Sequence, residues 1–465
     1  MARVVVCGGS VVGLTVALLL ARSGHDVVVL EQDPDAAPHP DMAWETWARK
    51  GVSQFHQPHN LLPRFQRVLD HELPDLAAAL LAAGCRQGSA LAALPPGVED
   101  RAPRPGDERF DAVNGRRPVV EAVFARAADG EPGVTVRRGV HVTGLVADAA
   151  DVMDGTTAVS GVTTGDGQTH LADLVVDAMG RASPTTGWLL GTGPEERSQD
   201  RGFVYYTRYF RADVLPEALA PALAAMERFS VLTLPGDGDT WGVTLSGSSG
   251  DRALRGLRHG EVFDRVVRAL PLHAQWLAGE PLSDVLPMAG IVDRYRRFVV
   301  AGRPVVTGLV AVGDAWSCTN PSAGRGLSLG VVQAVLLRDA VAAGTSDLTE
   351  LALRLDAATE RELTPFFCDQ EAADRDRRAE MEAYREGRPV PSQDEALSRL
   401  WTAAGRSADA FRGLMDDVGC LAHRHEVMAR PDVAAAMAAV GNPVRRPFPG
   451  PSREELENLL ADPAE

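Results

Sequence analysis

A glycine-rich turn close to the start of the chain constrains the fold more than any other feature. It lies between residues 3–7, which are rich in β-branched side chains, and residues 14–23, which are rich in Ala and Leu. A second apolar run, residues 26–30, follows and ends on Glu31. The turn itself consists of Gly8, Gly9, Ser10, Val11, Val12 and Gly13. This order of strand, glycine turn, helix and strand predicts a dinucleotide-binding βαβ unit.

The residues of the turn and of the second strand suit a bound dinucleotide. Ser10 stands where the second glycine of the fingerprint is usual, and its hydroxyl is able to bond a phosphate. Gly13 permits close packing of the helix on the strand, and the helix N-terminus offers free N–H groups to the pyrophosphate. Glu31, 18 residues after Gly13, is placed to accept hydrogen bonds from the adenosine ribose. The unit does not distinguish NAD from FAD.

Composition and charge exclude several other classes of protein. The chain of 465 residues carries 47 Lys and Arg against 63 Asp and Glu, a formal charge of −16, whereas a nucleic-acid binder normally presents a basic face. Hydrophobic residues make up 45%, which excludes a wholly disordered chain. The five cysteines are far apart and form no CxxC pair, so neither a disulfide framework nor a metal site is predicted.

The apolar run of residues 4–20 resembles a signal peptide in length, but the three glycines of the turn interrupt it. A secretory segment has no need of such glycines, so we interpret the run as the strand, turn and helix of the βαβ unit. No other uncharged segment approaches the length of a membrane span. Together with the cysteine usage, this indicates a cytoplasmic protein without a membrane span.

Hydrophobic periodicity predicts the remaining elements. Helices are expected at 69–83, 117–128, 251–277 and 326–342, and almost throughout 347–465. Strands are expected as a pair within 134–146, as a hairpin within 157–170, at 173–177 and 309–312, and as an antiparallel sheet from 202–211, 230–234 and 240–246. The densely charged run 369–385 is expected to be a solvated helix face.

A second motif lies far along the chain and selects the cofactor. Residues 313–326 read GDAWSCTNPSAGRG, between a short apolar run and a helical stretch. This segment closely resembles the GD…PxxGxG motif of flavoprotein monooxygenases of the para-hydroxybenzoate hydroxylase-like superfamily. The resemblance covers most of residues 1–345 and implies bound FAD. No His or Cys lies in the fingerprint turn, so the FAD is expected to be non-covalently bound. The helix that starts at the motif would direct its N-terminus at the flavin, where it stabilises negative charge.

The resemblance also implies roles for individual residues. In that family the aspartate of the motif bonds the ribitol chain and the proline lies near the isoalloxazine ring, roles that fall here on Asp314 and Pro321. The family places one arginine at the pyrophosphate, matched by Arg117, and another near the flavin, matched by Arg49. Beyond the fingerprint and Glu31, further cofactor contacts fall on Val142, Gly324, Arg325, Gly326 and Leu327.

The stretch after the predicted strand 173–177 departs from the aromatic hydroxylases of the superfamily. Those enzymes carry an aspartate, in a GADG stretch, that serves both FAD and NAD(P)H, and Met179 stands at that position here. A methionine cannot hydrogen-bond a nicotinamide nucleotide as a carboxylate does. The D-A-x-G-R-x-S form of residues 177–183 looks more like that of flavin epoxidases of bacterial polyether pathways, and it resembles styrene-monooxygenase-like relatives, several of which use a separate reductase. The WxWxIP stretch of flavin halogenases is absent. Electrons are expected from NAD(P)H or from a flavin reductase.

Monooxygenation of this kind needs reduced flavin to react with O₂ and a dry pocket that preserves the C4a-hydroperoxyflavin. Candidates for the pocket lining are aromatic and apolar residues of the predicted antiparallel sheet: Phe203, Tyr205, Tyr206, Tyr209, Trp241 and Met288. Arg208 stands in the middle of a strand, where it needs a partner or a ligand. Lys50, the only lysine, and His56 and His59 lie in the loop after Glu31. Arg208, Tyr206, Lys50 and His56 are the catalytic candidates, although a structural or surface role would also explain each of them.

The sequence thus predicts an α/β fold: a Rossmann-like FAD-binding domain, an inserted antiparallel-sheet substrate domain and a helical C-terminal region. The FAD-binding domain is assigned to 1–70, 112–190 and 285–345, the substrate domain to 71–111 and 191–284, and the helical region to 346–465. The expected activity is FAD-dependent hydroxylation or epoxidation of an apolar small molecule, of the kind found in secondary metabolism. An FAD-dependent oxidase or dehydrogenase/reductase without oxygen insertion, and a flavin-binding chain that has lost catalysis, are the alternatives.

Overall fold

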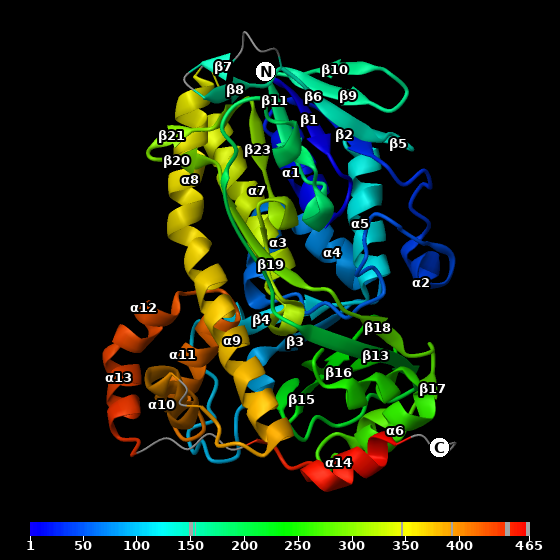
Figure 1. Ribbon diagram of the computed structural model, residues 1–465, viewed down its shortest axis with the longest axis vertical. Helices are drawn as coiled ribbons and strands as arrows, with labels where there is room; N and C mark the ends of the chain where they lie inside the picture. Colours follow the sequence, from blue (N-terminus) through cyan, green and yellow to red (C-terminus); the bar gives the residue numbers. More distant parts are fainter. Residues whose placement is uncertain (148–151, 154, 346, 392–393, 442–446, 462–465) are drawn as a thin grey trace.

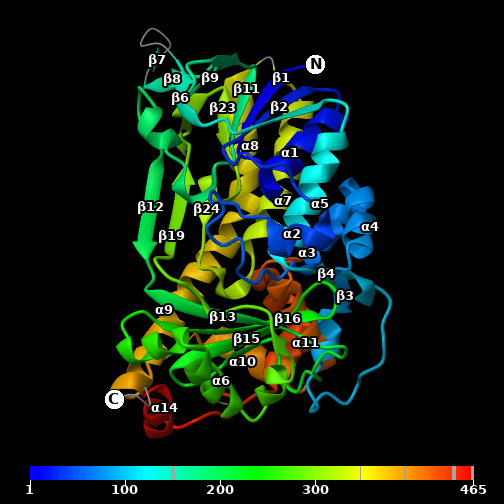
Figure 2. The same cartoon turned by 90° about the vertical axis from the view of Figure 1, so that its right-hand side faces the viewer.

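The computed structural model arranges the chain as two bodies along one long axis (Figure 1). The structure describes residues 1–147, 152–153, 155–345, 347–391, 394–441 and 447–461. The amino terminus lies at the far end of the first body, and helix α14 (Arg453–Leu460) lies at the opposite end of the molecule. Extended strands and one long helix run between the bodies, as the second view makes clear (Figure 2).

The first body is built around a five-stranded parallel sheet. Its strands are β1 (Arg3–Cys7), β2 (Asp26–Glu31), β5 (Val134–Arg138), β11 (Leu174–Asp177) and β23 (Leu309–Ala311), in the order β23-β11-β1-β2-β5. Each neighbouring pair is parallel. The predicted βαβ unit therefore lies at the centre of the sheet, and the predicted α/β class is confirmed.

Both faces of this sheet are covered, which explains why its strands read as continuous apolar runs. Val4 and Val6 of β1 point to a helical core, whereas Val5 and Cys7 point to the other face. The helices are α1 (Val11–Arg22), α5 (Arg117–Gly130) and α7 (Gly326–Ala342), with α2 (Ala43–Thr46), α3 (Pro63–Glu72) and α4 (Pro74–Ala82) packed beside them. The other face is covered by β6 (Val142–Val146), β9 (Gly161–Thr164) and β10 (Thr169–Leu171).

Two expectations for the first body are corrected. The strand pair predicted within 134–146 is wrong, because β5 joins the parallel sheet and β6 pairs with β9; Gly139, at a φ of +71°, lies between them. Helix α4 packs in the same core as α5, so this body extends beyond residue 70, where the sequence placed a boundary. The predicted hairpin is confirmed as β9 and β10, while β8 (Thr156–Ala158) pairs with β7 (Val152–Met153) and β22 (Val306–Thr307).

The second body holds the predicted antiparallel sheet. Its strands are β14 (Leu223–Ala225), β15 (Phe229–Pro235), β16 (Thr240–Ser248), β13 (Phe203–Arg211) and β17 (Glu280–Pro281), with β18 (Leu286–Met288) also paired to β13. One face packs on α6 (Gly260–Arg268) and α14 through residues such as Val243 and Leu245. On the other face, Thr207 bonds to Thr244 and to Gln57 of the first body, both at 2.9 Å. This second face is therefore turned toward the first body.

Several elements connect the two bodies. The strands β12 (Glu195–Asp200), β19 (Val292–Arg297) and β24 (Ser317–Cys318) form an antiparallel ribbon, and β3 (Arg86–Ser89) pairs with β4 (Asp111–Asn114). A short hairpin of β20 (Val299–Val300) and β21 (Arg303–Pro304) lies on the first body. Arg116, at the start of α5, forms a buried ion pair with Asp237 of the second body at 2.7 Å. These contacts fix one sheet against the other.

The predicted helical C-terminal region is confirmed. It comprises α8 (Leu348–Glu362), α9 (Thr364–Glu386), α10 (Glu395–Ala404), α11 (Ala408–Val418), α12 (Arg424–Ala429) and α13 (Pro431–Ala438), followed by α14. Asp347 caps α8 by accepting from the N–H groups of Thr349 and Glu350, and Gly387 ends α9 at a φ of +65°. Among the described residues, no helix is both long and apolar enough to cross a membrane.

Helix α9 corrects the interpretation of run 369–385 as a solvated face. Asp374 is 3% exposed and Glu380 is 4% exposed. They are buried because α9 runs from the first body onto the second and packs against β16 (Figure 1). The charges of this helix therefore belong in part to the junction of the two bodies.

Candidate active site

The predicted cofactor residues gather at the carboxyl edge of the parallel sheet. β1 ends at the glycine turn, β2 ends at Glu31, β11 leads into Ala178 and β23 leads into Asp314. Because these strands are neighbours and parallel, their carboxyl ends lie side by side. Open parallel sheets bind their ligands at this edge. The two sequence motifs, far apart in the chain, thus meet at one site.

Close backbone contacts explain two glycines of the turn. Gly8 has a φ of +108°, and a Cβ there would lie 2.4 Å from the carbonyl oxygen of Ala178. A Cβ on Gly13 would lie 2.0 Å from the carbonyl oxygen of Gly8. The N–H of Gly9 donates to Oε2 of Glu31 at 2.7 Å, which ties the turn to the end of β2. Larger residues at Gly8 and Gly13 would displace α1 from the sheet.

A buried ionic cluster lies beside the turn. Arg49, with a side chain 3% exposed, reaches Glu31 at 2.5 Å, Glu121 at 2.9 Å and Asp33 at 3.2 Å. Arg117 reaches Glu121 at 2.5 Å from the other side. Both arginines that the resemblance assigned to the cofactor are thus brought to the fingerprint and tied to one another through Glu121.

The charges of this cluster support one another. Burial raises the pKa of Glu121, but Arg117 and Arg49 outweigh it and hold that pKa below its usual range. Burial lowers the pKa of the Arg49 guanidinium, yet the neighbouring carboxylates raise it by more. Arg49 and Glu121 are therefore both charged at neutral pH. The sequence analysis missed Glu121, for which the available signal was its spacing of four residues from Arg117 on one helix.

Ser10 is engaged by the same cluster. Its hydroxyl donates to Oε1 of Glu121 at 2.6 Å and accepts from Nη2 of Arg117 at 2.9 Å. The hydroxyl predicted to bond a phosphate thus already has two partners. Among the described residues, Nη1 of Arg117 has no hydrogen-bond acceptor, and the first N–H groups of α1 have none within the helix. These are the donors left for a pyrophosphate.

Asp314 is a half-buried carboxylate at the end of β23. In the part of the chain that the structure describes, no donor bonds to its side chain. Burial raises its pKa against the attraction of Arg117, Arg181 and Arg294. A Cβ added to Gly326 would lie 3.9 Å from Oδ1 of Asp314, so this carboxylate stands at the N-terminus of α7. An unpaired carboxylate in such a place favours a ligand with hydroxyl groups.

The other residues of the second motif divide into two groups. Pro321 and Gly326 are exposed, and Gly324 adopts a φ of +68° beside Asn60. Arg325 turns its side chain away, to the carbonyl oxygen of Phe366 at 3.3 Å and to Asp417 at 3.5 Å. Leu327 is buried in the helical core. The side chains of Arg325 and Leu327 are thus engaged elsewhere, and these two residues can contact a cofactor only through their backbone.

Three apolar residues of the predicted site serve packing. Val11 is buried in the first turn of α1, and Val12 lies against α7, where a Cβ on Gly330 would come within 2.5 Å of it. Val142 is buried at the start of β6. The N–H of Val140, just before it, bonds to the carbonyl oxygen of Glu31. Val142 therefore lies close to the end of β2 but within the core.

The residues present fit FAD. Two helix N-termini and a free guanidinium nitrogen suit a pyrophosphate and an electron-rich ring, and two carboxylates, Glu31 and Asp314, suit the hydroxyls of ribose and ribitol. The decisive observation is the Asp314 carboxylate, which is half-buried without a hydrogen-bond donor from the described residues. This set of groups matches the donors and acceptors of a flavin dinucleotide.

The turn after β11 has no carboxylate to spare. Asp177 accepts from Ser183 Oγ at 2.5 Å, Thr185 Oγ1 at 2.6 Å and the N–H of Met179 at 3.0 Å. It is buried, and burial raises its pKa. Met179 is half-buried and packs against the core that lies between the parallel sheet and the β6-β9-β10 sheet. Asp177 closes this turn and is not available to a nicotinamide nucleotide.

The structure separates the predicted substrate contacts by the face of the second sheet. Tyr205 donates a hydrogen bond to Asn320 of the first body, and the ring of Tyr209 lies 4.6 Å from that of Trp44. Phe203 and Met288 cluster with Tyr205 on this same face. Tyr206 and Trp241 lie on the opposite face, in the core against α6. Four of the six predicted contacts are therefore turned toward the cofactor residues: Phe203, Tyr205, Tyr209 and Met288.

Two catalytic candidates on β13 are therefore corrected. Arg208 pairs with Asp264 of α6 at 2.8 Å and bonds to the carbonyl oxygen of Ser283 at 3.3 Å. Tyr206 packs on the same helical side. Side chains two apart on a strand share a face, so both point away from the first body. The unusual strand arginine has its partner within the second body.

The loop candidates are placed near the site. His56 is half-buried, with its ring 4.9 Å from that of Trp44, and burial together with Arg116 lowers its pKa. Burial and Arg117 lower the pKa of His59 to about 3. Both imidazoles are therefore neutral at pH 7. Lys50 is exposed and has no hydrogen-bond or ion-pair partner among the residues described.

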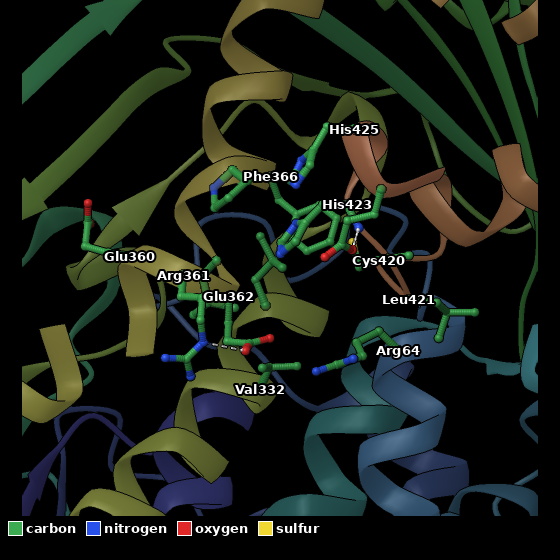
Figure 3. Close-up of a pocket in the computed structure, with 15 residues that line it drawn as sticks. Arg64, Val332, Glu360, Arg361, Glu362, Phe366, Cys420, Leu421, His423 and His425 are labelled. Atoms are coloured by element: carbon green, nitrogen blue, oxygen red, sulfur yellow. Dashed lines mark hydrogen bonds and ion pairs between the residues drawn. The ribbon is translucent and has the colours of Figure 1, made fainter. Parts of the chain in front are cut away.

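A separate cavity lies between α3, α7, the start of α9 and the segment that precedes α12. It measures about 460 Å³ and is lined by Leu329, Val332, Phe366, Arg64 and His423, among others (Figure 3). Neither the fingerprint nor Asp314 lines it. Within the described ranges, no group of three or more His, Cys, Asp or Glu side chains is placed to hold a metal ion. The cofactor residues thus form a site distinct from this cavity.

Known structures share the fold. PqsL from Pseudomonas aeruginosa, a probable FAD-dependent monooxygenase, aligns with 82% of this chain and 96% of its own, at a TM-score of 0.60 and 20% identity. A variant of HpxO from Klebsiella pneumoniae, solved with FAD, aligns with 90% of this chain and 98% of its own, at a TM-score of 0.59 and 17% identity. The chain has the para-hydroxybenzoate hydroxylase-like fold of these proteins.

One relative is found by sequence. Protein Rv3254 of Mycobacterium tuberculosis is 27% identical over 446 residues, which cover 88% of this chain and 85% of that protein. No family model matches the chain. The likeness to Rv3254 extends beyond the fingerprint and spans both bodies.

Proposed function

We propose that the chain is an FAD-dependent monooxygenase that hydroxylates or epoxidises a small molecule. The observation that carries the proposal is the meeting of Asp314 and the N-terminus of α7 with the dinucleotide fingerprint at one edge of the sheet. A fingerprint alone suits NAD and FAD equally, whereas a second helix N-terminus beside an unpaired carboxylate suits the ring and ribitol of a flavin. The printed descriptions of PqsL and HpxO support the same choice.

FAD, when bound, supplies the redox chemistry with O₂, and the chain's own residues bind and orient it. Arg117 and the N-terminus of α1 would hold the pyrophosphate, and Glu31 would hold the ribose. Asp314 would hold the ribitol. Arg49 would support the cofactor site indirectly, because its guanidinium is occupied by ion pairs that keep Glu31, Asp33 and Glu121 in place. Lys50, exposed beside it, is not needed for this arrangement.

The substrate site belongs to the face of the second sheet that is turned to the first body. The hydroxyls of Tyr205 and Thr207 are already bonded to Asn320 and Gln57. Apart from the Tyr209 hydroxyl, which is buried and has no hydrogen-bond partner among the described residues, this wall offers mainly ring faces and methyl groups, together with Phe203 and Met288. Such a lining supports an apolar substrate and the exclusion of water that monooxygenation needs.

The purified chain is expected to be yellow and to release unmodified FAD on acid precipitation. No Cys or His lies in the fingerprint turn, and Cys318, the nearest thiol to Asp314 along the chain, is buried. Absorbance spectra and mass analysis of the supernatant check this. Colourless protein that cannot be reconstituted with FAD would contradict the proposal. Consumption of O₂ with peroxide as its only product would instead favour an FAD-dependent oxidase.

NADPH alone is expected to reduce the bound flavin slowly, even with substrate present, whereas a separate flavin reductase supports product formation. The reason is that Met179 replaces the usual carboxylate and Asp177 is buried and already accepts three hydrogen bonds within its own turn. The D-A-x-G-R-x-S form of this turn also supports epoxidation, as in the polyether-pathway enzymes that it resembles. Stopped-flow reduction with and without the reductase makes the comparison. Rapid reduction of the isolated protein by NADPH would refute the need for a partner.

A further inference from the structure

The turn of residues 320–322, beside the start of α7, is held from three directions. The N–H of Asn320 donates to Asp293 of β19 at 2.7 Å, and the Asn320 side chain accepts from Tyr205 of β13. From the third side comes Asp374 of α9. Pro321, which the family places near the isoalloxazine ring, is the middle residue of this turn. Whatever fixes Asn320 and Ser322 therefore also fixes Pro321.

Asp374 makes unusual use of its two oxygens. Oδ1 accepts three hydrogen bonds: from Asn320 Nδ2 at 2.9 Å, from Gln370 Nε2 at 3.0 Å and from Ser322 Oγ at 3.1 Å. Gln370 also donates to Ser322 Oγ at 3.0 Å, which closes the network. Oδ2 is fully buried and has no hydrogen-bond partner among the residues that the structure describes. A buried oxygen without a donor disfavours the ionised form of a carboxyl group.

The charges around Asp374 act in the same sense. On β19, Asp293 is a second carboxylate, and Arg201, which precedes β13, pairs with Asp293 at 2.8 Å rather than with Asp374. Arg201 also binds Glu371 of α9. On β13, the Tyr205 phenol is neutral, since burial raises its pKa. Burial is the main cause that raises the pKa of Asp374 to about 7, and Asp293 adds to it, whereas the three hydrogen bonds to Oδ1 act in the opposite direction.

We propose that Asp374 is a positioning residue of the active site, through which helix α9 holds the Pro321 turn in place. The carboxyl group of Asp374 also changes its own charge beside the flavin. The proposal rests on the proposed function and extends it, because it makes the helical C-terminal region part of the cofactor site. Two hydrogen bonds from the turn end on Oδ1, so the turn cannot shift without breaking them. Asp374 contacts both neighbours of Pro321, Asn320 and Ser322. Its ionisation would therefore place a buried negative charge close to Pro321.

The first test uses the full chain without added flavin. In Asp374→Ala, backbone amides of the peptide 317–326 are expected to exchange hydrogen about tenfold faster than in wild type, since the turn loses both bonds. Asp376→Asn is the matched control, because within the described ranges Asp376 pairs only with the adjacent Arg375 on the same helix. Equal exchange in all three proteins would overturn the positioning role, whether or not FAD binds. If Asp374→Ala fails to fold, Ser322→Ala serves in its place, because it removes one of the two hydrogen bonds that the turn donates to Oδ1.

The second test separates charge from shape. Asp374→Asn keeps the size of the side chain and an acceptor oxygen but cannot ionise. The raised pKa means that the carboxyl stabilises the folded chain most fully below about pH 4 and loses that contribution as pH rises toward 7. The melting temperature of Asp374→Asn should therefore rise relative to wild type between pH 5 and pH 8. A constant difference across this range would overturn the charge role.

The holoenzyme gives a third measurement. At pH 8 the flavin in Asp374→Asn should be easier to reduce than in wild type, because a neutral side chain replaces a carboxylate, and at pH 5.5 the two reduction potentials should agree. If the difference in reduction potential between variant and wild type is the same at both pH values, Asp374 does not act on the flavin through its charge. Failure of the wild-type chain itself to bind FAD would refute the proposed function and with it the flavin role, while the exchange result would still decide whether Asp374 positions the turn.

Discussion

Replacement of Arg49 by alanine is expected to lower the free energy of unfolding by about 3–5 kcal/mol and to abolish retention of FAD. The guanidinium lies within 3.2 Å of three carboxylates, and the side chains involved are at most 10% exposed. Its removal leaves Glu31 and Asp33 without their arginine and leaves Glu121 with Arg117 alone. Buried carboxylates that lose their counter-ion must ionise at a cost or take up a proton. Chemical denaturation and flavin content measure the two effects.

The neighbouring residue supplies the control for this prediction. Lys50→Ala removes an adjacent positive charge that is exposed and has no partner among the described residues. It should change the free energy of unfolding by less than about 0.5 kcal/mol. Arg49→Lys should fall between the two, because an ammonium cannot span three carboxylates as a planar guanidinium does. A loss below about 1 kcal/mol in Arg49→Ala would mean that the cluster does not stabilise the fold.

The glycine turn and the second motif were predictable because each is a local pattern whose meaning does not depend on the rest of the chain. A left-handed φ at Gly8 and the contact of Gly13 with the Gly8 carbonyl need glycine wherever this turn occurs. The likeness of residues 313–326 to a flavoprotein motif likewise implied a helix start, and α7 begins at Gly326. Adjacent parallel strands then bring both motifs to one edge.

The orientation of side chains across the second sheet was not predictable in this way. The sequence identifies β13 as a strand, and its period of two separates Tyr205 from Tyr206, but either face could have been the one turned to the cofactor. The choice depends on which side of the sheet α6 covers, and α6 begins 49 residues after the end of β13. Arg208 finds its partner, Asp264, on that helix. Tertiary packing, not strand pattern, decides such a role.

The same limit explains the buried charges. The run 369–385 has the composition of an exposed helix, and nothing in it identifies Asp374 as the residue that contacts the Pro321 turn. Glu121 reads as one charge among apolar residues of α5, although it is the centre of the fingerprint cluster. Each carboxylate takes its role from partners contributed by distant segments. Sequence spacing located the cofactor residues, whereas it did not locate the residues that support them.

Asp314→Asn is expected to weaken FAD binding roughly ten- to a hundredfold, which corresponds to about 1–3 kcal/mol, while leaving the chain without flavin as stable as wild type or more stable. The two signs differ because Asp314 has no donor among the described residues, so its charge is a burden until a ligand with hydroxyl groups arrives. Burial raises the pKa of this carboxyl, which means that its cost to the folded chain grows as pH rises. The stability advantage of the variant should therefore grow as pH rises above about 4, the ordinary pKa of an aspartate.

The two measurements are fluorescence titration with FAD and thermal unfolding of the flavin-free protein. Asp339→Asn is the matched control, because Asp339 lies on α7, the helix whose N-terminus Asp314 faces. Among the described residues its side chain pairs only with the neighbouring Arg338, and it is 60% exposed. This variant should leave FAD affinity unchanged. A carboxylate kept for packing would lose stability when replaced, and a misassigned motif would leave FAD affinity intact. Only a residue held for the cofactor combines weaker binding with an unimpaired or more stable flavin-free chain.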